Sequence, residues 1–363
     1  MKYDVAGLGN AIVDVLVRFP DDSLLQQLKL TRGIMHPVSH EEWQRTYLEV
    51  KGLGAEVHSG GSGANTLCAV GLAGKKALFC GQVGDDQFGA MYADSLKRAC
   101  GEHSLRVEPG AFTGKCLSLI SMRDAERTMC THLGAAVDLP ELGPFAQHIL
   151  ESKVLHIEGY LLLGDRTADV AFDAMARAKA AGVMVSIDAS DPFVVHTVPD
   201  RMWRAAKDYA TVVFLNADEA SGMTGLPPAE AVHAVAEQVP IVVVKLGREG
   251  SLIKHKDEVH RVGIHAVKAI DTTGAGDAYA GGFLVGLCSG WDLARCGDLG
   301  ARFASLTVGQ IGAVCREPGP CPAPSPRPPP GPRHEPPRRG RRGHPQPEVL
   351  GHHRQPGYAG GCA

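Results

Sequence analysis

Short apolar runs alternate with amphipathic stretches along most of this chain. Strands are predicted at Tyr3–Leu8, Ala77–Gly81, Val154–Ile157, Val183–Ile187, Val212–Leu215 and Ile241–Leu246. Helices are predicted between them, for example at Gln87–Ala99, Arg166–Ala181 and Ala229–Gln238. Runs that are apolar throughout are typical of strands buried on both faces of a sheet. The pattern predicts an α/β fold, a three-layer α/β/α sandwich with a mostly parallel central sheet.

Two regions, at about 11–58 and 111–133, interrupt this alternation. They contain the β-rich pieces Ile12–Arg18, Cys116–Met122 and Arg127–His132 without crossover helices. Strand-like pieces that lack a crossover helix do not fit a parallel α/β layer. We expect them to form a small separate β-sheet that acts as a lid.

The composition changes sharply near residue 316. The segment 316–363 holds 14 of the 24 prolines, eight arginines, no lysine and three acids. It therefore carries about +5, and the rest of the chain about −8, of the net charge of −3. Such a segment buries too little apolar area to become ordered, so we predict a domain at 1–315 and a disordered tail. The amino-acid composition of the tail also resembles GC-rich DNA translated out of frame. Two interpretations stay open, a tail without a function and an arm that binds a partner or nucleic acid.

Charge and cysteine usage narrow the class of protein. A net charge of −3 gives no excess of basic residues that would attract nucleic acid or an acidic membrane surface. No apolar run is long enough for a transmembrane helix, and the N-terminus does not look like a secretory signal. The ten cysteines are scattered without a C-x-x-C pair. We expect a cytoplasmic protein with reduced thiols that binds neither nucleic acid nor membranes.

The stretch Ala269–Leu287, AIDTTGAGDAYAGGFLVGL, carries the clearest chemistry. We predict a short strand ending at Asp271, a turn, and a helix beginning near Gly274. Gly274, Ala275 and Gly276 have little side chain, so a ligand can approach the unpaired amides of the first helical turn. These amides and the positive end of the helix dipole favour an anion, such as a phosphoryl group that is being transferred.

Asp277 follows these small residues in the first helical turn. A carboxylate at this place is able to accept a proton from a hydroxyl while the amides hold the phosphoryl group. The alternative is an acid that only interacts favourably with the helix dipole.

Two other phosphate-binding motifs fail in this chain. Gly7-Leu-Gly9 begins like a dinucleotide fingerprint, but Ile12 stands where the third glycine belongs. The segment 71–76 lacks the spacing and the Ser or Thr of a P-loop. A mechanism based on either motif is therefore not expected.

Five segments in order resemble the ribokinase-like, PfkB-type family of carbohydrate and nucleoside kinases. They are GLGNAIVD (7–14), GGSGANTLCAVGLAG with CGQVGDDQFG (60–89), NADE (216–219), KLGREG (245–250) and DTTGAGD (271–277). The resemblance covers about residues 1–315. It implies a ribokinase-like fold with a β lid and an ATP-dependent phosphotransferase with Asp277 as general base.

The resemblance also implies residues for the acceptor. Asn10 and Asp14 are expected where the first strand ends and the lid begins. Asp14 would hold vicinal hydroxyls, and a carboxylate suits such bidentate hydrogen bonding. Asn10, Gly60, Gly61 and Asn65 would lie against the same sugar. The alternatives are turn capping for the polar residues and helix packing for the glycines.

The nucleotide side is implied in the same way. The residues assigned to the nucleotide are Asn216, Lys245, Gly247 and Gly250. Glu219 would organise Mg²⁺ through water, an arrangement that suits a cation that retains its waters. The alternative is a helix-capping Asn216 with a surface Glu219. Asp271 and Thr273 match positions that help to hold a monovalent cation, such as K⁺, in relatives.

Lid segments look more like those of adenosine kinases than of ribokinases. They are TGKCLSLI (113–120), ERTMCTHLGAA (126–136) and HIEGYLL (156–162). By this resemblance Arg127 would reach the transferred phosphate, and Cys116, Met129 and Tyr160 would form an apolar wall. Lid or core packing, and for Arg127 a solvated charge, are the alternatives.

Adenosine is thus the leading acceptor, and the product would be AMP. A ribokinase- or fructokinase-type sugar kinase and a weakly active ligand-binding relative stay open. We identify no basic cluster for a phosphorylated acceptor. The family resemblance allows a monomer or a lid-mediated homodimer. After Val314 the chain departs from the family pattern, which puts closure of the adenine site in doubt.

Overall fold

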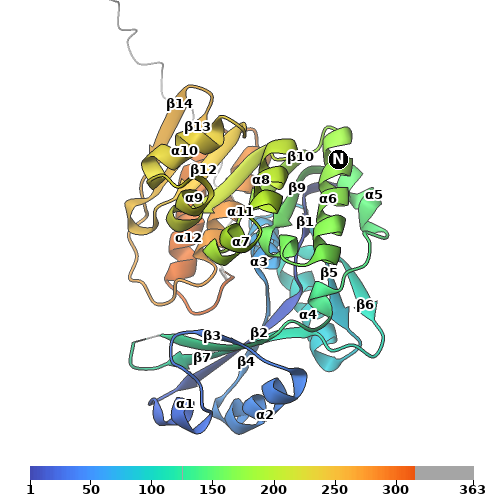
Figure 1. Cartoon of the computed structure of the whole chain (residues 1–363), viewed down its shortest axis with the longest axis vertical. Coiled ribbons are helices and arrows are strands. Elements are labelled where there is room, and N and C mark those ends of the chain that lie inside the picture. Colours follow the sequence, from blue (N-terminus) through green and yellow to red (C-terminus); the bar gives the residue numbers. More distant parts are fainter. Residues whose placement is uncertain (125, 315–363) are drawn as a thin grey trace, which may run out of the picture. The chain divides into compact units, whose positions relative to one another are not determined.

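The computed structural model describes residues 1–124 and 126–314. The predicted tail at 316–363 lies outside the described residues. Within them, two β-sheets and the helices that cover them make up the fold (Figure 1).

The larger sheet has nine strands in the described part of the chain. Their spatial order is β14 (Glu258–Val262), β13 (Ser251–His255), β12 (Ile241–Lys245), β11 (Val212–Asn216), β10 (Met184–Asp188), β9 (Ser152–Glu158), β1 (Tyr3–Leu8), β5 (Ala77–Gly84) and β6 (Gly101–Glu108). All neighbours pair in parallel except β12 with β13 and β13 with β14. The strand order reverses direction between β1 and β9, and ligands bind at such a switch point, beyond the carboxyl ends of the strands.

Helices bury both faces of the larger sheet. In β11, Val212 and Phe214 belong to one core cluster and Val213 and Leu215 to the other, which is why the strand is apolar throughout. The first cluster includes α3 (Ser62–Leu72), α4 (Gln87–Ala99), α11 (Ala275–Cys288) and α12 (Leu293–Val308). The second includes α5 (Phe145–Leu150), α6 (Asp165–Ala180), α7 (Pro192–Thr197), α8 (Pro199–Asp208), α9 (Ala217–Thr224) and α10 (Pro228–Ala236). The predicted α/β/α layering is confirmed.

The smaller sheet lies below the larger one in Figure 1. Its order is β3 (Met35–Pro37), β8 (Arg127–His132), β7 (Gly114–Ser121), β2 (Ile12–Phe19) and β4 (Glu56–Gly60). Val13, Val15 and Val17 pack with Trp43 and Leu25 on the outer face, from α2 (His40–Val50) and α1 (Ser23–Gln27). The alternate residues of β2 point to the opposite face. Short 3₁₀ turns complete the described elements, at η1 (Lys51–Leu53), η2 (Gly134–Val137), η3 (Gly159–Leu162) and η4 (Gly247–Glu249).

Two sequence predictions about local structure are wrong. No strand ends at Asp271, because residues 263–274 form a loop in which the amides of Ile270 and Asp271 donate to the Val308 carbonyl of α12. Asp14 lies inside β2 and not at the end of the first strand. Asn10 does follow that strand, as expected.

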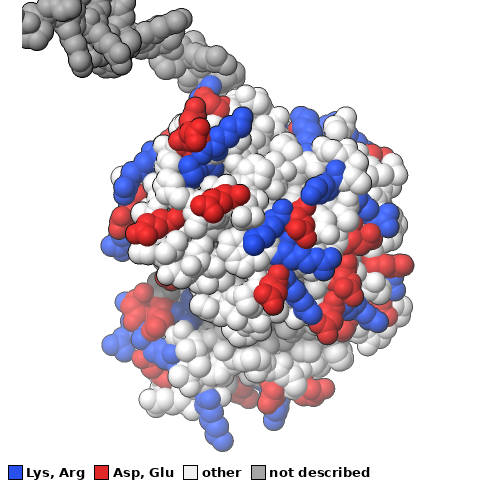
Figure 2. Space-filling view, turned by 45° about the horizontal axis from the view of Figure 1, so that its top comes forward, with Lys and Arg blue, Asp and Glu red and all other residues white. Residues whose placement is uncertain are grey.

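Basic and acidic side chains are interspersed on the face that Figure 2 shows. Exposed pairs such as Arg177–Asp173 are examples of this mixing. In the described residues, no helix has the length and apolar character needed to cross a membrane. The seven cysteines among these residues are all free thiols, and all but Cys288 are buried.

Candidate active site

The N-terminus of α11 opens onto a cavity. Gly274 precedes the helix with φ +71°, and a Cβ there would lie 2.3 Å from the Ala313 carbonyl oxygen, so only glycine fits. Within the described part of the chain, the amides of Gly276 and Asp277 have no hydrogen-bond acceptor. The first turn of a 14-residue helix thus presents unpaired donors to the cavity, as an anion site requires.

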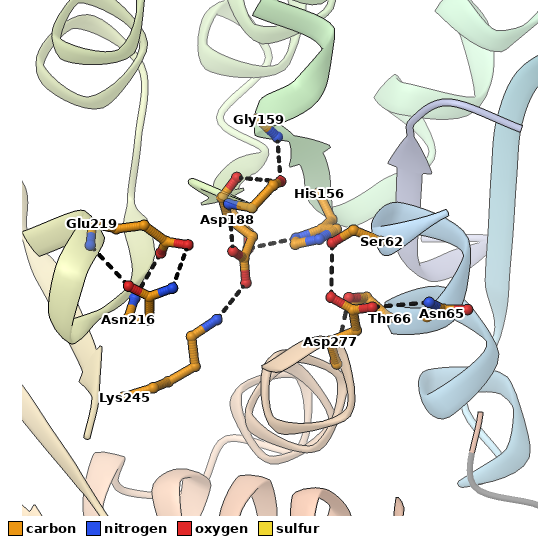
Figure 3. A network of polar contacts seen from close by, with 12 residues as sticks. Ser62, Asn65, Thr66, His156, Gly159, Asp188, Asn216, Glu219, Lys245 and Asp277 are labelled. Carbon is orange, nitrogen blue, oxygen red and sulfur yellow. Dashed lines mark hydrogen bonds and ion pairs between the residues drawn. The ribbon is translucent and has the colours of Figure 1, made fainter. Parts of the chain in front are cut away.

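The Asp277 carboxylate lines this cavity beside the amides. It accepts hydrogen bonds from Ser62 Oγ at 2.7 Å and from Asn65 Nδ2 at 2.9 Å, both on α3 (Figure 3). Burial and the nearby charge of Asp188 raise the pKa of Asp277 to about 6. A carboxylate with this pKa is mostly ionised at neutral pH and suits a general base.

The cavity has a volume of about 840 Å³ and divides into a polar and an apolar part. Polar lining residues include Ser62, Tyr160, Asp188, Asn216, Glu219 and Lys245. Apolar lining residues include Ile264, Val267, Ala269, Ala301, Ala304 and Val308. A polyphosphate at the polar end and a flat base at the apolar end match this division.

Residues at the ends of β12 and β13 border the same cavity. Lys245 Nζ donates to Asp188 Oδ2 at 2.8 Å (Figure 3). Gly247 and Gly250 both have positive φ, and a Cβ on Gly250 would lie 2.0 Å from the Val262 carbonyl oxygen. The structure thus brings the predicted nucleotide-side residues Lys245, Gly247 and Gly250 to one cavity.

Asn216 and Glu219 form a capping box at the start of α9. The Glu219 carboxylate accepts hydrogen bonds from the backbone N–H of Asn216 at 2.6 Å and from the side-chain Nδ2 of Asn216 at 2.7 Å. Burial raises the pKa of Glu219 to about 7, and Lys245 opposes the rise. The alternative of a capping Asn216 is therefore realised, but Glu219 is buried and lines the cavity instead of the surface.

Acceptor-side residues gather where β1, β2, β4 and α3 meet. A Cβ on Gly60 would lie 2.2 Å from Asp14 Oδ2, and one on Gly61 would lie 2.3 Å from the Asn10 carbonyl oxygen. Gly61 has φ +88° and precedes α3. Burial raises the pKa of Asp14 to about 7, although Arg127 lowers it. Both glycines thus leave room for neighbouring acceptor-side groups.

The predicted apolar wall is only partly assembled. Cys116 pairs across the sheet with Asp14, and it clusters with Ile12, Ala136 and Met129. Tyr160 does not belong to this cluster. Its hydroxyl donates to Asp191 at 3.0 Å and its side chain lines the large cavity, because it follows β9 of the larger sheet.

Arg127 lies on the inner face of the smaller sheet and forms an ion pair with Asp271. Asp271 also accepts from the amides of Thr273 at 3.0 Å and Gly312 at 2.9 Å. A carboxylate engaged by a guanidinium and two amides does not fit the predicted monovalent-cation site, and we derive no step through such a cation. The contact of Arg127 with a phosphate stays a prediction.

A smaller cavity of about 260 Å³ lies beside Asp14. Its lining includes His58, Arg98 and Arg127, three basic side chains from three different elements. This cluster is not evident from the sequence, because residues this far apart in the chain meet only in the fold.

Three polar residues of the site were not assigned a role from the sequence. Ser62 lies inside the segment 60–89 that resembles the family, and a Ser at a helix start was the available signal; in the fold its Oγ donates to Asp277. Glu158 ends β9, where its carboxylate accepts from the Gly63 amide at 2.7 Å and the Asn10 amide at 3.4 Å. Burial raises the pKa of Glu158 to about 8. Asp188 ends β10, and the polar ends of apolar strands were the signal for both acids.

Among residues 1–124 and 126–314, no group of three or more His, Cys, Asp or Glu side chains is arranged to hold a metal ion. Glu219 faces the polar end of the cavity with its oxygens already hydrogen-bonded, which fits contact with a hydrated Mg²⁺ through water.

The family of the chain follows from its similarity to known proteins. The pfkB family carbohydrate kinase profile matches residues 34–318. This chain belongs to that family. It is a kinase, and membership of the family implies ATP as the phosphoryl donor.

Individual relatives of this pfkB-family kinase differ in acceptor. A probable fructokinase-5 from Arabidopsis thaliana is 31% identical over 268 residues, 70% of this chain and 81% of that protein. The crystal structure of adenosine kinase from Sinorhizobium meliloti has 33% identity and a TM-score of 0.78, over 86% of this chain and 96% of that one. A probable sugar kinase from Rhizobium etli has 30% identity and a TM-score of 0.79, over 87% and 96%. The family kinase fold is therefore shared, whereas the acceptor varies.

Proposed function

We propose that this kinase transfers the γ-phosphoryl group of ATP to a primary hydroxyl of a nucleoside, with adenosine as the acceptor and AMP as the product. The observation that carries the chemistry is the Asp277 carboxylate beside the unpaired amides of α11. Asp277 accepts the hydroxyl proton as the new O–P bond forms, while the bond between the γ-phosphorus and the β–γ bridging oxygen breaks and ADP leaves. The unpaired amides of Gly276 and Asp277 stabilise the charge on the transferring group, whereas the Ala275 amide, predicted to take part, donates to the Thr272 carbonyl at 3.3 Å.

We expect ATP to bind in the large cavity, because the predicted nucleotide-binding residues line it. Its triphosphate would lie near Lys245, Gly247, Gly250 and Asn216, and its base between the apolar residues of α12 and the 263–274 loop. Mg²⁺ would be held by the phosphates and, through water, by Glu219, and it would neutralise phosphate charge. Closure of the smaller sheet over the site would exclude water that otherwise hydrolyses ATP.

An adenosine acceptor is supported by the surface around Asp14. A carboxylate suited to vicinal hydroxyls lies next to the apolar Ile12, Cys116 and Met129 on the inner face of the smaller sheet. Such a surface suits a ribose joined to a neutral, flat base. The similarity to the adenosine kinase of Sinorhizobium meliloti supports the same acceptor.

A sugar acceptor is the second candidate. The basic lining of the smaller cavity, with His58, Arg98 and Arg127 beside Asp14, would suit a phosphorylated sugar. The 31% identity to a probable fructokinase also supports a sugar.

An ADP-release panel over adenosine, inosine, ribose, fructose and fructose 6-phosphate separates these candidates. We expect the highest kcat/KM for adenosine, at least about tenfold above any sugar, which corresponds to about 1.4 kcal/mol. A higher value for a sugar would replace adenosine by the second candidate. Thermal stabilisation by adenosine without ADP release from any acceptor would indicate a ligand-binding relative.

A further inference from the structure

A buried ion pair links two strands at the polar end of the large cavity. Lys245 ends β12 and Asp188 ends β10, with β11 between them, and Nζ lies 2.8 Å from Oδ2. The side chains are only 15% and 3% exposed. Within the described residues, Asp188 is the one carboxylate in ion-pair contact with Lys245. Breaking such a buried pair leaves an uncompensated charge.

The ammonium of Lys245 lies against the first turn of α11. A Cβ on Gly276 would lie 3.1 Å from Nζ, so a larger residue at this place would crowd the ammonium. The unpaired amides of Gly276 and Asp277 belong to the same turn. The Lys245 ammonium thus lies beside the positive end of the α11 helix dipole, and the negative charge of Asp188 balances this positive charge.

Asp188 is itself held in place by its surroundings (Figure 3). Its Oδ1 accepts from the Ser190 amide at 2.9 Å, and Ser190 has φ +73°. Ser190 Oγ in turn donates to the Asp188 carbonyl at 3.2 Å and accepts from the Gly159 amide at 2.9 Å. The carboxylate therefore has one well-defined direction, toward Lys245.

We infer that Asp188 is a positioning residue for phosphoryl transfer, which holds the charged Lys245 ammonium against the first turn of α11 so that both meet the transferring group. A lysine ammonium has three donors, and Asp188 takes one of them. The other two remain for phosphate oxygens that enter the cavity. The inference rests on the kinase reaction and on no particular acceptor.

The charges around Lys245 predict a pH signature. Burial lowers the pKa of Lys245, but Asp188 first, then Glu219 of α9 and Asp277 of α11, raise it more, so the net shift is upward. Removing the Asp188 charge takes away the largest interaction that raises this pKa, and the ammonium then loses its proton at lower pH. The pKa of Asp277 falls as well, because Asp188 contributes to its rise after burial. The acid limb of the pH–rate profile, set by Asp277, and the alkaline limb, set by Lys245, should therefore both move to lower pH.

Asp188→Asn tests this in the full chain, with kcat and kcat/KM for ATP measured from pH 5 to 10. The amide keeps a hydrogen-bond acceptor for Lys245 and removes only the charge. In wild type the pKa of Lys245 lies above its ordinary 10.5, so we expect no complete alkaline limb below pH 10. In Asp188→Asn we expect the limb to move down by at least about one pH unit, so that the rate at pH 10 falls below that of wild type. In a Lys245→Arg background the guanidinium stays charged, and Asp188→Asn should bring no alkaline limb into this range.

Tripolyphosphate binding, followed by thermal shift across the same pH range, gives a readout without an acceptor. Loss of its stabilising effect at lower pH in Asp188→Asn than in wild type supports the inference even if no acceptor in the panel is phosphorylated. A uniform loss of rate and of binding at all pH values, with both limbs unmoved, overturns it and leaves Asp188 a structural residue. Asp4→Asn is the control, since Asp4 forms a comparable ion pair with Lys153 at 2.7 Å and neither residue lines the cavity.

Discussion

At the scale of residues, the site contains several carboxylates whose pKa values are raised because they are buried. Burial raises the pKa of Asp277 to about 6, that of Asp14 to about 7 and that of Glu158 to about 8. Each meets different partners. Asp277 has two neutral donors, Ser62 and Asn65, and faces the cavity, so it is the acid that ionises first and is free to accept a proton.

The raised pKa of Asp277 predicts how kcat/KM changes on the acid side of its pH profile. A general base acts only when ionised, so kcat/KM should fall as the pH drops through the raised pKa of Asp277, at about 6. ADP release measured from pH 4 to 8 locates this limb. A limb near pH 4, the ordinary range of an aspartate, would remove Asp277 from the role.

At the scale of elements, the site depends on where strands end and helices begin. Asn10, Glu158, Asp188, Asn216 and Lys245 all stand at or just beyond the carboxyl ends of neighbouring parallel strands. The starts of α3 and α11 face this edge and supply Ser62, Asn65 and Asp277. The junction between β4 and α3 must therefore be tight, and Gly60 and Gly61 provide the room.

Gly61→Ala should disturb this junction more than a matched glycine elsewhere. Gly54 has φ +90° with no atom within 4 Å of a Cβ, so Gly54→Ala measures left-handed backbone strain alone, about 1–2 kcal/mol. Gly61→Ala adds two costs, a ψ of 133° that lies outside the left-handed region and a collision with the Asn10 carbonyl, together about 1–3 kcal/mol more.

Urea unfolding of both variants and KM for the acceptor give the measurement. We expect a raised acceptor KM for Gly61→Ala alone. Equal losses of stability for the two variants, with unchanged KM for both, would show that the junction tolerates a side chain.

At the scale of the whole molecule, the sequence predicted what is local and missed what is long-range. The strand–helix alternation and the start of α11 were predicted, because runs of apolar residues and a Gly-Ala-Gly turn act locally. α2 was missed inside the β-rich region, although Ser39 and Glu42 form a capping box at its start. Arg127 meets Asp271 across 144 residues, and no local pattern signals such a pairing.

The same limit applies to the roles of Glu158 and Asp188. Both are single acids at the ends of apolar strands, and their significance depends on the strand order around the switch point between β1 and β9. Family resemblance placed Lys245 and Asn216 at the nucleotide side, but their partners became visible only in the fold.

The kinetics of Asp277→Asn test the central claim most directly. The amide keeps the size of the side chain, and Asn65, whose Oδ1 has no partner within the described residues, is able to turn its oxygen toward the new amide. Thermal shifts by ATP and by the acceptor should stay near wild type, while kcat falls by about 10²–10⁴, the span of a positioned base. An unchanged kcat with intact binding would contradict the account.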